Sequence, residues 1–345
     1  MIHLRSLSKD FTVPGGEVVH AVRGITLDVS PGELVAVLGP NGAGKSTTLR
    51  MLTTLVAPTA GTATVVGHDV VAAPAEVRRR IGYVGQGNGA GHAQLVGDEL
   101  RSQGRIHGLS ADRAASRADE LMAALDLAEL ARRKVGDLSG GQRRRLDIAM
   151  GIVHQPTLLF LDEPSTGLDP QSRANLWAHI LRIRAELGMT VVLTTHYLDE
   201  ADAMAERVVV VDHGEVIADD TAEALKADLA GDRVDLEVPT APDAVALSGA
   251  LAALPQVVDV AARDQRLEAR VAHGPRAVPA VLAAAASTGT AVLAVDVHRP
   301  TLDDVFLSLT GRSLREDGRA DIERPTADTT PDPTRTTTTR EEITA

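Results

Sequence analysis

The segment from Gly39 to Ser46, Gly-Pro-Asn-Gly-Ala-Gly-Lys-Ser, constrains the fold more than any other part of the chain. It follows a short apolar run, Leu34 to Leu38, and precedes an apolar-periodic stretch that begins at Thr47, so the pattern predicts a strand, a tight loop and a helix. This spacing and context match a phosphate-binding loop, in which backbone N–H groups face the β-phosphate, Lys45 reaches the β and γ oxygens and the Ser46 hydroxyl can bind Mg²⁺. The predicted nucleotide-binding residues here are Gly39, Asn41, Gly42, Gly44, Lys45, Ser46 and Thr47.

Two adjacent acids end a second apolar run. Leu158 to Leu161 reads as a strand, and Asp162 and Glu163 follow it directly. In isolation such a pair is a strand edge that faces solvent. Beside a phosphate-binding loop, Asp162 is placed to hold Mg²⁺ through water, and Glu163 can polarise the attacking water or accept its proton.

Between these motifs, Leu-Ser-Gly-Gly-Gln spans Leu138 to Gln142 and opens an amphipathic helix. Ser139 and Gln142 have the spacing of a helix capping box, which needs no ligand. Capping does not require Gly140 and Gly141, however, and two glycines at a helix start leave bare N–H groups where an anionic phosphate can approach.

Apolar runs recur at Thr190 to Leu193 and Val208 to Val211, with helical patterns between them. Buried strands that alternate with helices indicate an α/β fold with a mostly parallel sheet. The stretch from Asp112 to Arg132 has Ala and Leu at helical spacing and reads as a helical insertion. We expect one domain over residues 1–225.

The pattern changes after this domain. Residues 232–311 read β-α-β-β-α-β, the order of a ferredoxin-like sandwich, and predict a small α+β domain. Residues 312–345 contain mostly Thr, Pro, Asp and Arg, which predicts a disordered tail.

Composition narrows the class of protein. The 345 residues carry a net charge of −12, which argues against a nucleic-acid partner. Cysteine is absent, which excludes disulfides and thiolate metal sites. We find no signal-peptide pattern and no apolar run near the roughly 20 residues of a membrane-spanning helix. We therefore expect a chain that is soluble by itself.

A phosphate-binding loop, Leu138 to Gln142 and Leu161 to Pro164, in this order, resemble the ATP-binding-cassette ATPases over about Ile2 to Leu225. The resemblance implies that Gln86 contacts Mg²⁺ or the attacking water, that His196 faces the γ-phosphate and that Asp169 touches the opposite subunit's site. It also places Phe11 where an aromatic stacks on adenine. Phe11 also fits an ordinary core residue, and Asp169 before a proline fits a helix N-cap.

The resemblance implies a homodimer that sandwiches two ATP molecules, each bound by the phosphate loop of one subunit and by Ser139, Gly140, Gly141 and Gln142 of the other. It assigns catalysis to Lys45, Gln86, Glu163 and His196, and Mg²⁺ binding to Ser46, Gln86 and Asp162. A separate transmembrane permease would be held near Gln86 and the helical insertion, which would place the chain on the cytoplasmic face of the membrane.

Closer similarity is to the ATPase subunits of daunorubicin-resistance drug exporters. It extends to Pro300 to Gly311, Pro-Thr-Leu-Asp-Asp-Val-Phe-Leu-Ser-Leu-Thr-Gly, which lies outside the ATPase core. This resemblance implies an antibiotic or lipid-like substrate. Gly87 to Gly91 departs from the family pattern at the expected permease contact. The alternative is a soluble cassette ATPase that acts as a clamp in DNA repair or translation.

Overall fold

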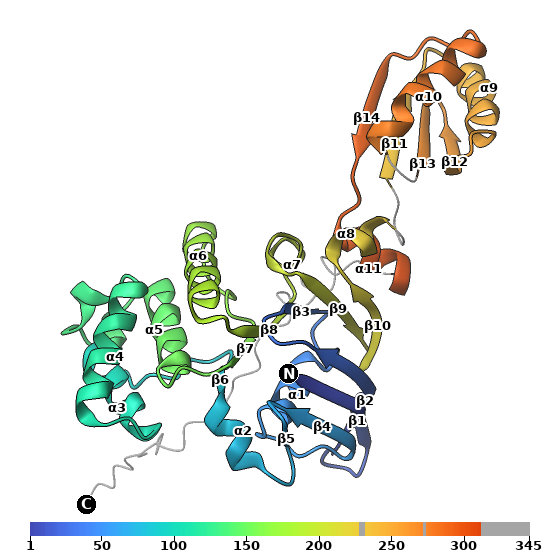
Figure 1. Ribbon diagram of the computed structural model, residues 1–345. Coiled ribbons are helices and arrows are strands. Elements are labelled where there is room, and N and C mark those ends of the chain that lie inside the picture. Colours follow the sequence, from blue (N-terminus) through green and yellow to red (C-terminus); the bar gives the residue numbers. More distant parts are fainter. Residues whose placement is uncertain (228–231, 272–273, 312–345) are drawn as a thin grey trace, which may run out of the picture.

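The computed structural model describes residues 1–227, 232–271 and 274–311, and in this part of the chain the strands form three sheets (Figure 1). The predicted tail from residue 312 lies outside the described residues. The central sheet contains, in spatial order, β10 (Glu215–Asp220), β9 (Arg207–Asp212), β3 (Leu34–Leu38), β8 (Thr190–Thr195), β7 (Leu158–Asp162) and β6 (Ile81–Val84).

Every pair in the central sheet is parallel except β10 with β9. Parallel strands are covered on both faces, which is why their sequences are continuous apolar runs rather than alternating ones. Leu34, Ala36 and Leu38 of β3 belong to one core, whereas Val35 and Val37 belong to another. The predicted α/β fold with a mostly parallel sheet is confirmed.

A second, antiparallel sheet shares the latter core. It contains β2 (Val18–Val29), β1 (Ile2–Thr12), β4 (Ala60–Val65) and β5 (His68–Asp69). Its inward side chains pack with α1, which lies between the two sheets.

Some helices of the first domain cover the central sheet, and others form a separate helical layer. They are α1 (Lys45–Leu52), α2 (Pro74–Arg80), α3 (Val96–Ile106), α4 (Ala111–Ala124), α5 (Gly140–Ile152), α6 (Pro170–Leu187), α7 (Leu198–Met204) and α8 (Ala222–Leu225). The helical insertion is therefore shorter than predicted, because Asp126 adopts a φ of 52°, which a right-handed helix cannot include. Short 3₁₀ turns follow at Ala128–Leu130 and Val135–Asp137.

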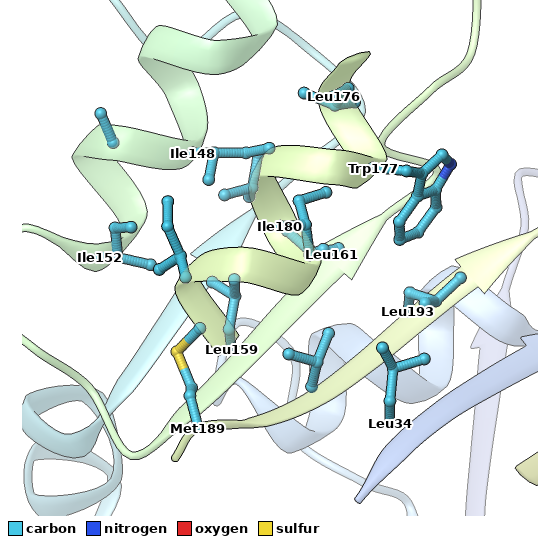
Figure 2. Packing of buried hydrophobic residues seen from close by; sticks show 14 of the residues in the cluster. Leu34, Ile148, Ile152, Leu159, Leu161, Leu176, Trp177, Ile180, Met189 and Leu193 are labelled. Atoms are coloured by element: carbon cyan, nitrogen blue, oxygen red, sulfur yellow. The ribbon is translucent and has the colours of Figure 1, made fainter. Parts of the chain in front are cut away.

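The larger core lies between the central sheet and helices α5 and α6. Figure 2 shows Ile148 and Ile152 of α5 together with Leu176, Trp177 and Ile180 of α6 and with Leu159, Leu161 and Leu193 of the central sheet. All of these side chains are buried, and Trp177 is the only tryptophan in the chain. Its fluorescence therefore reports on this core alone.

The second domain has its own core and sheet. Its strands, in spatial order, are β12 (Val257–Arg263), β13 (Arg266–Val271), β11 (Asp232–Glu237) and β14 (Ala294–His298). Each neighbouring pair is antiparallel, and α9 (Ala241–Ala252) and α10 (Gly274–Ser287) supply buried side chains to one face. This strand order and connectivity are those of a ferredoxin-like sandwich.

One helix departs from the predicted division at residue 311. Helix α11 (Leu302–Thr310) packs against α7 and α8, and Leu302, Val305 and Phe306 are buried in the core of the first domain. Figure 1 shows α11 beside α8, whereas the sheet of the second domain extends away from α11. Thr301 and Asp304 form a capping box, and Gly311 ends the helix with a φ of 74°. The apolar residues of the Pro300 to Gly311 motif thus fasten the end of the second domain to the ATPase domain.

Phe306→Ala should lower the free energy of unfolding of the first domain by about 3–5 kcal/mol, because it removes a fully buried ring from that core. Chemical denaturation followed by Trp177 fluorescence measures this change. Leu307→Ala on the same helix, where the side chain is 46% exposed, is the matched control and should change it by less than about 0.5 kcal/mol. An unchanged Trp177 transition in Phe306→Ala would show that α11 does not stabilise the first domain.

Candidate functional site

The phosphate-binding loop joins the end of β3 to the start of α1 at the carboxyl edge of the central sheet. Gly44 has a φ of 99°, and a Cβ there would lie 2.4 Å from the Ala21 carbonyl oxygen. A Cβ on Gly39 would lie 2.1 Å from the Val211 carbonyl oxygen. Both positions therefore require glycine. Gly44 is the N-cap of α1 and provides no side-chain cap, so the first N–H groups of the helix stay free for an anion.

Lys45 is a buried cation beneath this loop. Its side-chain ammonium donates to the carbonyl oxygens of Gly39 at 2.7 Å and Pro40 at 2.9 Å. Its Nζ also lies 3.9 Å from Oε1 of Glu163. Burial lowers the pKa of Lys45, and the carboxylates of Glu163 and Asp162 oppose this shift. The loop thus holds a desolvated positive charge beside two acids, where phosphate oxygens can replace the carbonyls as acceptors.

Asp162 is fully buried at the end of β7. Its Oδ1 accepts hydrogen bonds from the hydroxyls of Ser46 at 2.8 Å and Thr194 at 2.7 Å. Its Oδ2 is buried without a hydrogen-bond partner. The Gln86 amide donates to the Ser46 hydroxyl at 3.2 Å. A buried carboxylate oxygen that lacks a partner, beside hydroxyl and amide oxygens, matches the ligand preference of a hard divalent cation.

Glu163 extends beyond the strand with a φ of 46°. Its N–H donates to Thr194, and its Oε2 accepts from the Thr166 hydroxyl at 3.2 Å. His196 Nδ1 lies 3.3 Å from the same Oε2 without hydrogen-bond geometry. Burial acts to raise the pKa of Glu163, but His196 and Lys45 outweigh it and hold the pKa below its ordinary value. The carboxylate is therefore ionised at neutral pH and able to accept a proton.

The capping-box interpretation of the Ser-Gly-Gly-Gln segment describes its local structure correctly. The Ser139 hydroxyl accepts from the Gln142 N–H at 3.3 Å, and the Gln142 side-chain oxygen accepts from the Ser139 N–H at 3.0 Å. A Cβ on Gly141 would meet the Ser172 hydroxyl at 3.0 Å, and one on Gly140 would meet Leu168 at 3.7 Å. This turn therefore packs against the start of α6 rather than joining the residues around Lys45.

For Asp169 and Phe11 the sequence allows a structural as well as a nucleotide-contacting interpretation. Asp169 caps α6, because its side chain accepts from the Ser172 N–H at 2.9 Å and Pro170 is the first helical residue. Hydrogen bonds from the side chain and from the N–H of Ser172 hold the pKa of Asp169 below its ordinary value. Phe11 is 39% exposed, with the Lys9 ammonium 5.0 Å from its ring centroid, so the core interpretation of Phe11 is wrong. Of the remaining loop residues, Asn41 and Gly42 are exposed and Thr47 is half-buried.

Arg144 is a buried residue of α5 to which the sequence assigned no role. Its guanidinium donates to the carbonyl oxygens of Pro164 and Gly85, both at 2.7 Å, and of Asp162 at 3.2 Å. It therefore links the helix of the Ser-Gly-Gly-Gln segment to the loops that carry Gln86 and Glu163. Its only sequence signal is its place in a run of three arginines, where no local pattern separates the buried one from its neighbours.

Comparison with known proteins agrees with this geometry. The family model described as ABC transporter matches residues 22–166, and the C-terminal domain of DrrA1-3-like ATP-binding proteins matches residues 221–310. The chain is 46% identical to the daunorubicin resistance ATP-binding protein DrrA3 of Streptomyces coeruleorubidus, over 88% of this chain and 96% of that protein. It is 44% identical to the daunorubicin/doxorubicin resistance ATP-binding protein DrrA of Streptomyces peucetius, over 84% and 88%.

Solved structures with the same fold include a dimeric post-hydrolysis state of the ATP-binding cassette MJ0796 bound to ADP and Pi. It superposes with a TM-score of 0.59 at 26% identity, over 64% of this chain and 98% of that one. These relatives support a transporter subunit and not the DNA-repair or translation alternative. The chain belongs to the ABC transporter family as an ATP-binding subunit of the daunorubicin-resistance type, and it is an ATPase.

Proposed function

We propose that this ATPase drives export of an antibiotic or lipid-like molecule through a separate transmembrane permease, at the cytoplasmic face of the membrane. Relatives named for resistance to daunorubicin, and one named for resistance to linearmycin in Bacillus subtilis at 35% identity, favour this class of substrate. Among the described residues, no helix combines the length and hydrophobicity needed to cross a bilayer.

The observation that carries the proposed chemistry is the cluster of Lys45, Asp162 and Glu163 at one edge of the sheet. The phosphate loop and Lys45 would bind the β- and γ-phosphates, and exposed Phe11 would stack on the adenine. Ser46, Asp162 and Gln86 would hold Mg²⁺, because the unpartnered Asp162 oxygen needs a cation or a donor. The Mg²⁺ would neutralise charge on the phosphates.

The positions of the remaining groups support a role for each of them. The ionised carboxylate of Glu163 accepts a proton from the water that attacks the γ-phosphorus, and the Thr166 hydroxyl orients that carboxylate. His196, beside the same carboxylate, contacts the γ-phosphate. Gln86 senses the occupied site through Ser46, since its amide already reaches the Ser46 hydroxyl.

We propose that Ser139 to Gln142 and Asp169 complete the ATP site of a second subunit. Ser139 and Gly140 are exposed and lie at the N-terminus of α5, where free N–H groups favour phosphate. Gly140 and Gly141 adjoin Leu168 and Ser172, which flank Asp169. One exposed surface therefore presents both segments, and the dimeric cassette structures are consistent with such an arrangement.

A cavity of about 370 Å³ beside Gln86 is our candidate for the permease contact. Gly85, Gly87 and Gly89 line it together with residues of α3 and α5. Asp147 of α5 accepts from the Gly89 N–H at 3.0 Å, which holds the atypical glycine-rich segment against the cavity.

Glu163→Gln should lower kcat for ATP by at least about a hundredfold, because it removes the proton acceptor while leaving Lys45 and the phosphate loop intact. Trapped ATP should then hold the subunits together as a dimer, which light scattering measures. Glu186→Gln, at an exposed acid on α6, is the control and should match the wild type. A Glu163→Gln protein that stays monomeric with saturating ATP would contradict the sandwich dimer.

Mixed dimers test whether the site is shared. In a Glu163→Gln background, one subunit carries Lys45→Ala and the other carries Ser139→Ala. If the segments act across the interface, one composite site collects both defects and the other is intact, so the mixed dimer should trap one ATP and each parent homodimer almost none. If the mixed dimer trapped as little ATP as the parent homodimers, Ser139 would contact the ATP of its own subunit.

A further inference from the structure

Glu200 is a buried acid just after the segment that carries His196. It lies in the first turn of α7, and its side chain is 3% exposed. Its Oε2 accepts from the Thr195 hydroxyl at 3.2 Å, and that hydroxyl accepts from the Tyr197 N–H at 2.9 Å. Glu200 therefore holds the backbone on both sides of His196.

Arg173 of α6 meets this segment from the opposite side. Its Nε lies 3.5 Å from Oε1 of Glu200, and its guanidinium carbon lies 4.1 Å from the centroid of the Tyr197 ring. The Tyr197 ring in turn contacts the His196 ring, with centroids 4.2 Å apart. A buried carboxylate needs a cation nearby, and this arginine supplies it.

Arg173 also belongs to the segment that begins at Asp169. Its N–H donates to the Asp169 carbonyl oxygen at 2.9 Å, in the first turn of α6. Asp169 caps that turn, so a displacement of Arg173 moves the capped end of the helix with it. The Arg173–Glu200 pair is therefore a direct connection between the His196 segment and the Asp169 segment.

The contact between Arg173 and Glu200 lacks hydrogen-bond geometry. Both Arg173 Nε and Glu200 Oε1 are buried without a hydrogen-bond partner, so the pair is an ion pair whose bonding is incomplete. Helix α7 also packs against α11, whose Phe306 is fully buried. The packing of α11 on α7 opposes displacement of α7 itself.

We propose that Arg173 and Glu200 are positioning residues that couple His196, at one ATP site, to Asp169, which faces the other. This inference rests on the proposed roles of His196 and Asp169. Neither residue touches nucleotide. The pair aligns the two segments, so that occupancy of one site by ATP alters the contact made to the second.

Glu200→Gln and Arg173→Met keep the side-chain volume but remove the charge pair. Each should lower kcat about tenfold, with the KM for ATP within twofold of the wild type, because the phosphate-binding residues are untouched. The double variant should be no slower than either single one, since all three proteins lack the same interaction. Arg173→Lys, which keeps the charge, should retain more activity than Arg173→Met. The Hill coefficient for ATP should fall toward one in both single variants.

Asp199→Asn is the matched control, because Asp199 lies 4.0 Å from the same arginine but is 78% exposed. The kcat of Asp199→Asn should stay within twofold of the wild-type value. The pair would have only a structural role if the kcat losses of the two single variants multiplied in the double variant. The same conclusion would follow if the variants with low kcat had lost the Trp177 unfolding transition. Unchanged kcat and Hill coefficient in a folded Arg173→Met or Glu200→Gln protein would overturn the coupling. His196→Ala in the same assay separates the two hypotheses: full activity there contradicts the proposed function, whereas loss there with normal Arg173→Met activity contradicts only the coupling.

Discussion

The buried carboxylate of Asp162 is the interaction on which the site depends. Burying a charged group is costly unless donors and a counter-charge surround it. Asp162 obtains its donors from Ser46 and Thr194, which belong to the first turn of α1 and to β8. Lys45 supplies a nearby positive charge, and the carboxylates of Asp162 and Glu163 in turn oppose the lowering of the Lys45 pKa by burial. This mutual dependence fixes α1 and the ends of two neighbouring strands relative to one another before any nucleotide binds.

Arginines carry the contacts from this centre outward. Arg144 bonds to backbone carbonyls of the loops that flank Asp162 and Gln86, so that α5 and those loops must move together. Arg173 plays the corresponding part between α6 and α7. A planar guanidinium suits this role because its donors reach several acceptors at once from a fixed geometry. The segments predicted to contact ATP in one subunit and in its partner are thus connected through these two arginines.

Helix α11 attaches the second domain to the core of the ATPase domain. The second domain's own core holds a ferredoxin-like sheet, but the chain then returns and buries Phe306 in the core of the ATPase domain. Since α11 rests on α7, which begins directly after His196 and Tyr197, the attachment lies next to the nucleotide-sensing segment. The motif from Pro300 to Gly311 therefore stabilises the ATPase domain and also ends the accessory domain.

By itself, the sequence determined the phosphate loop, the acid pair, the capping box and the continuous apolar strands, because each depends on residues close together in the chain. It did not indicate the antiparallel sheet of β1, β2, β4 and β5, whose partly exposed strands lack such runs. Nor did it reveal the roles of Arg144 and Glu200 or the partner core of α11. Ser46 and Asp162 are 116 residues apart, and Gly85 and Arg144 are 59 apart. Such contacts exist only once parallel strands bring their carboxyl ends to a common edge, so the tertiary structure alone decided which local motifs share a site.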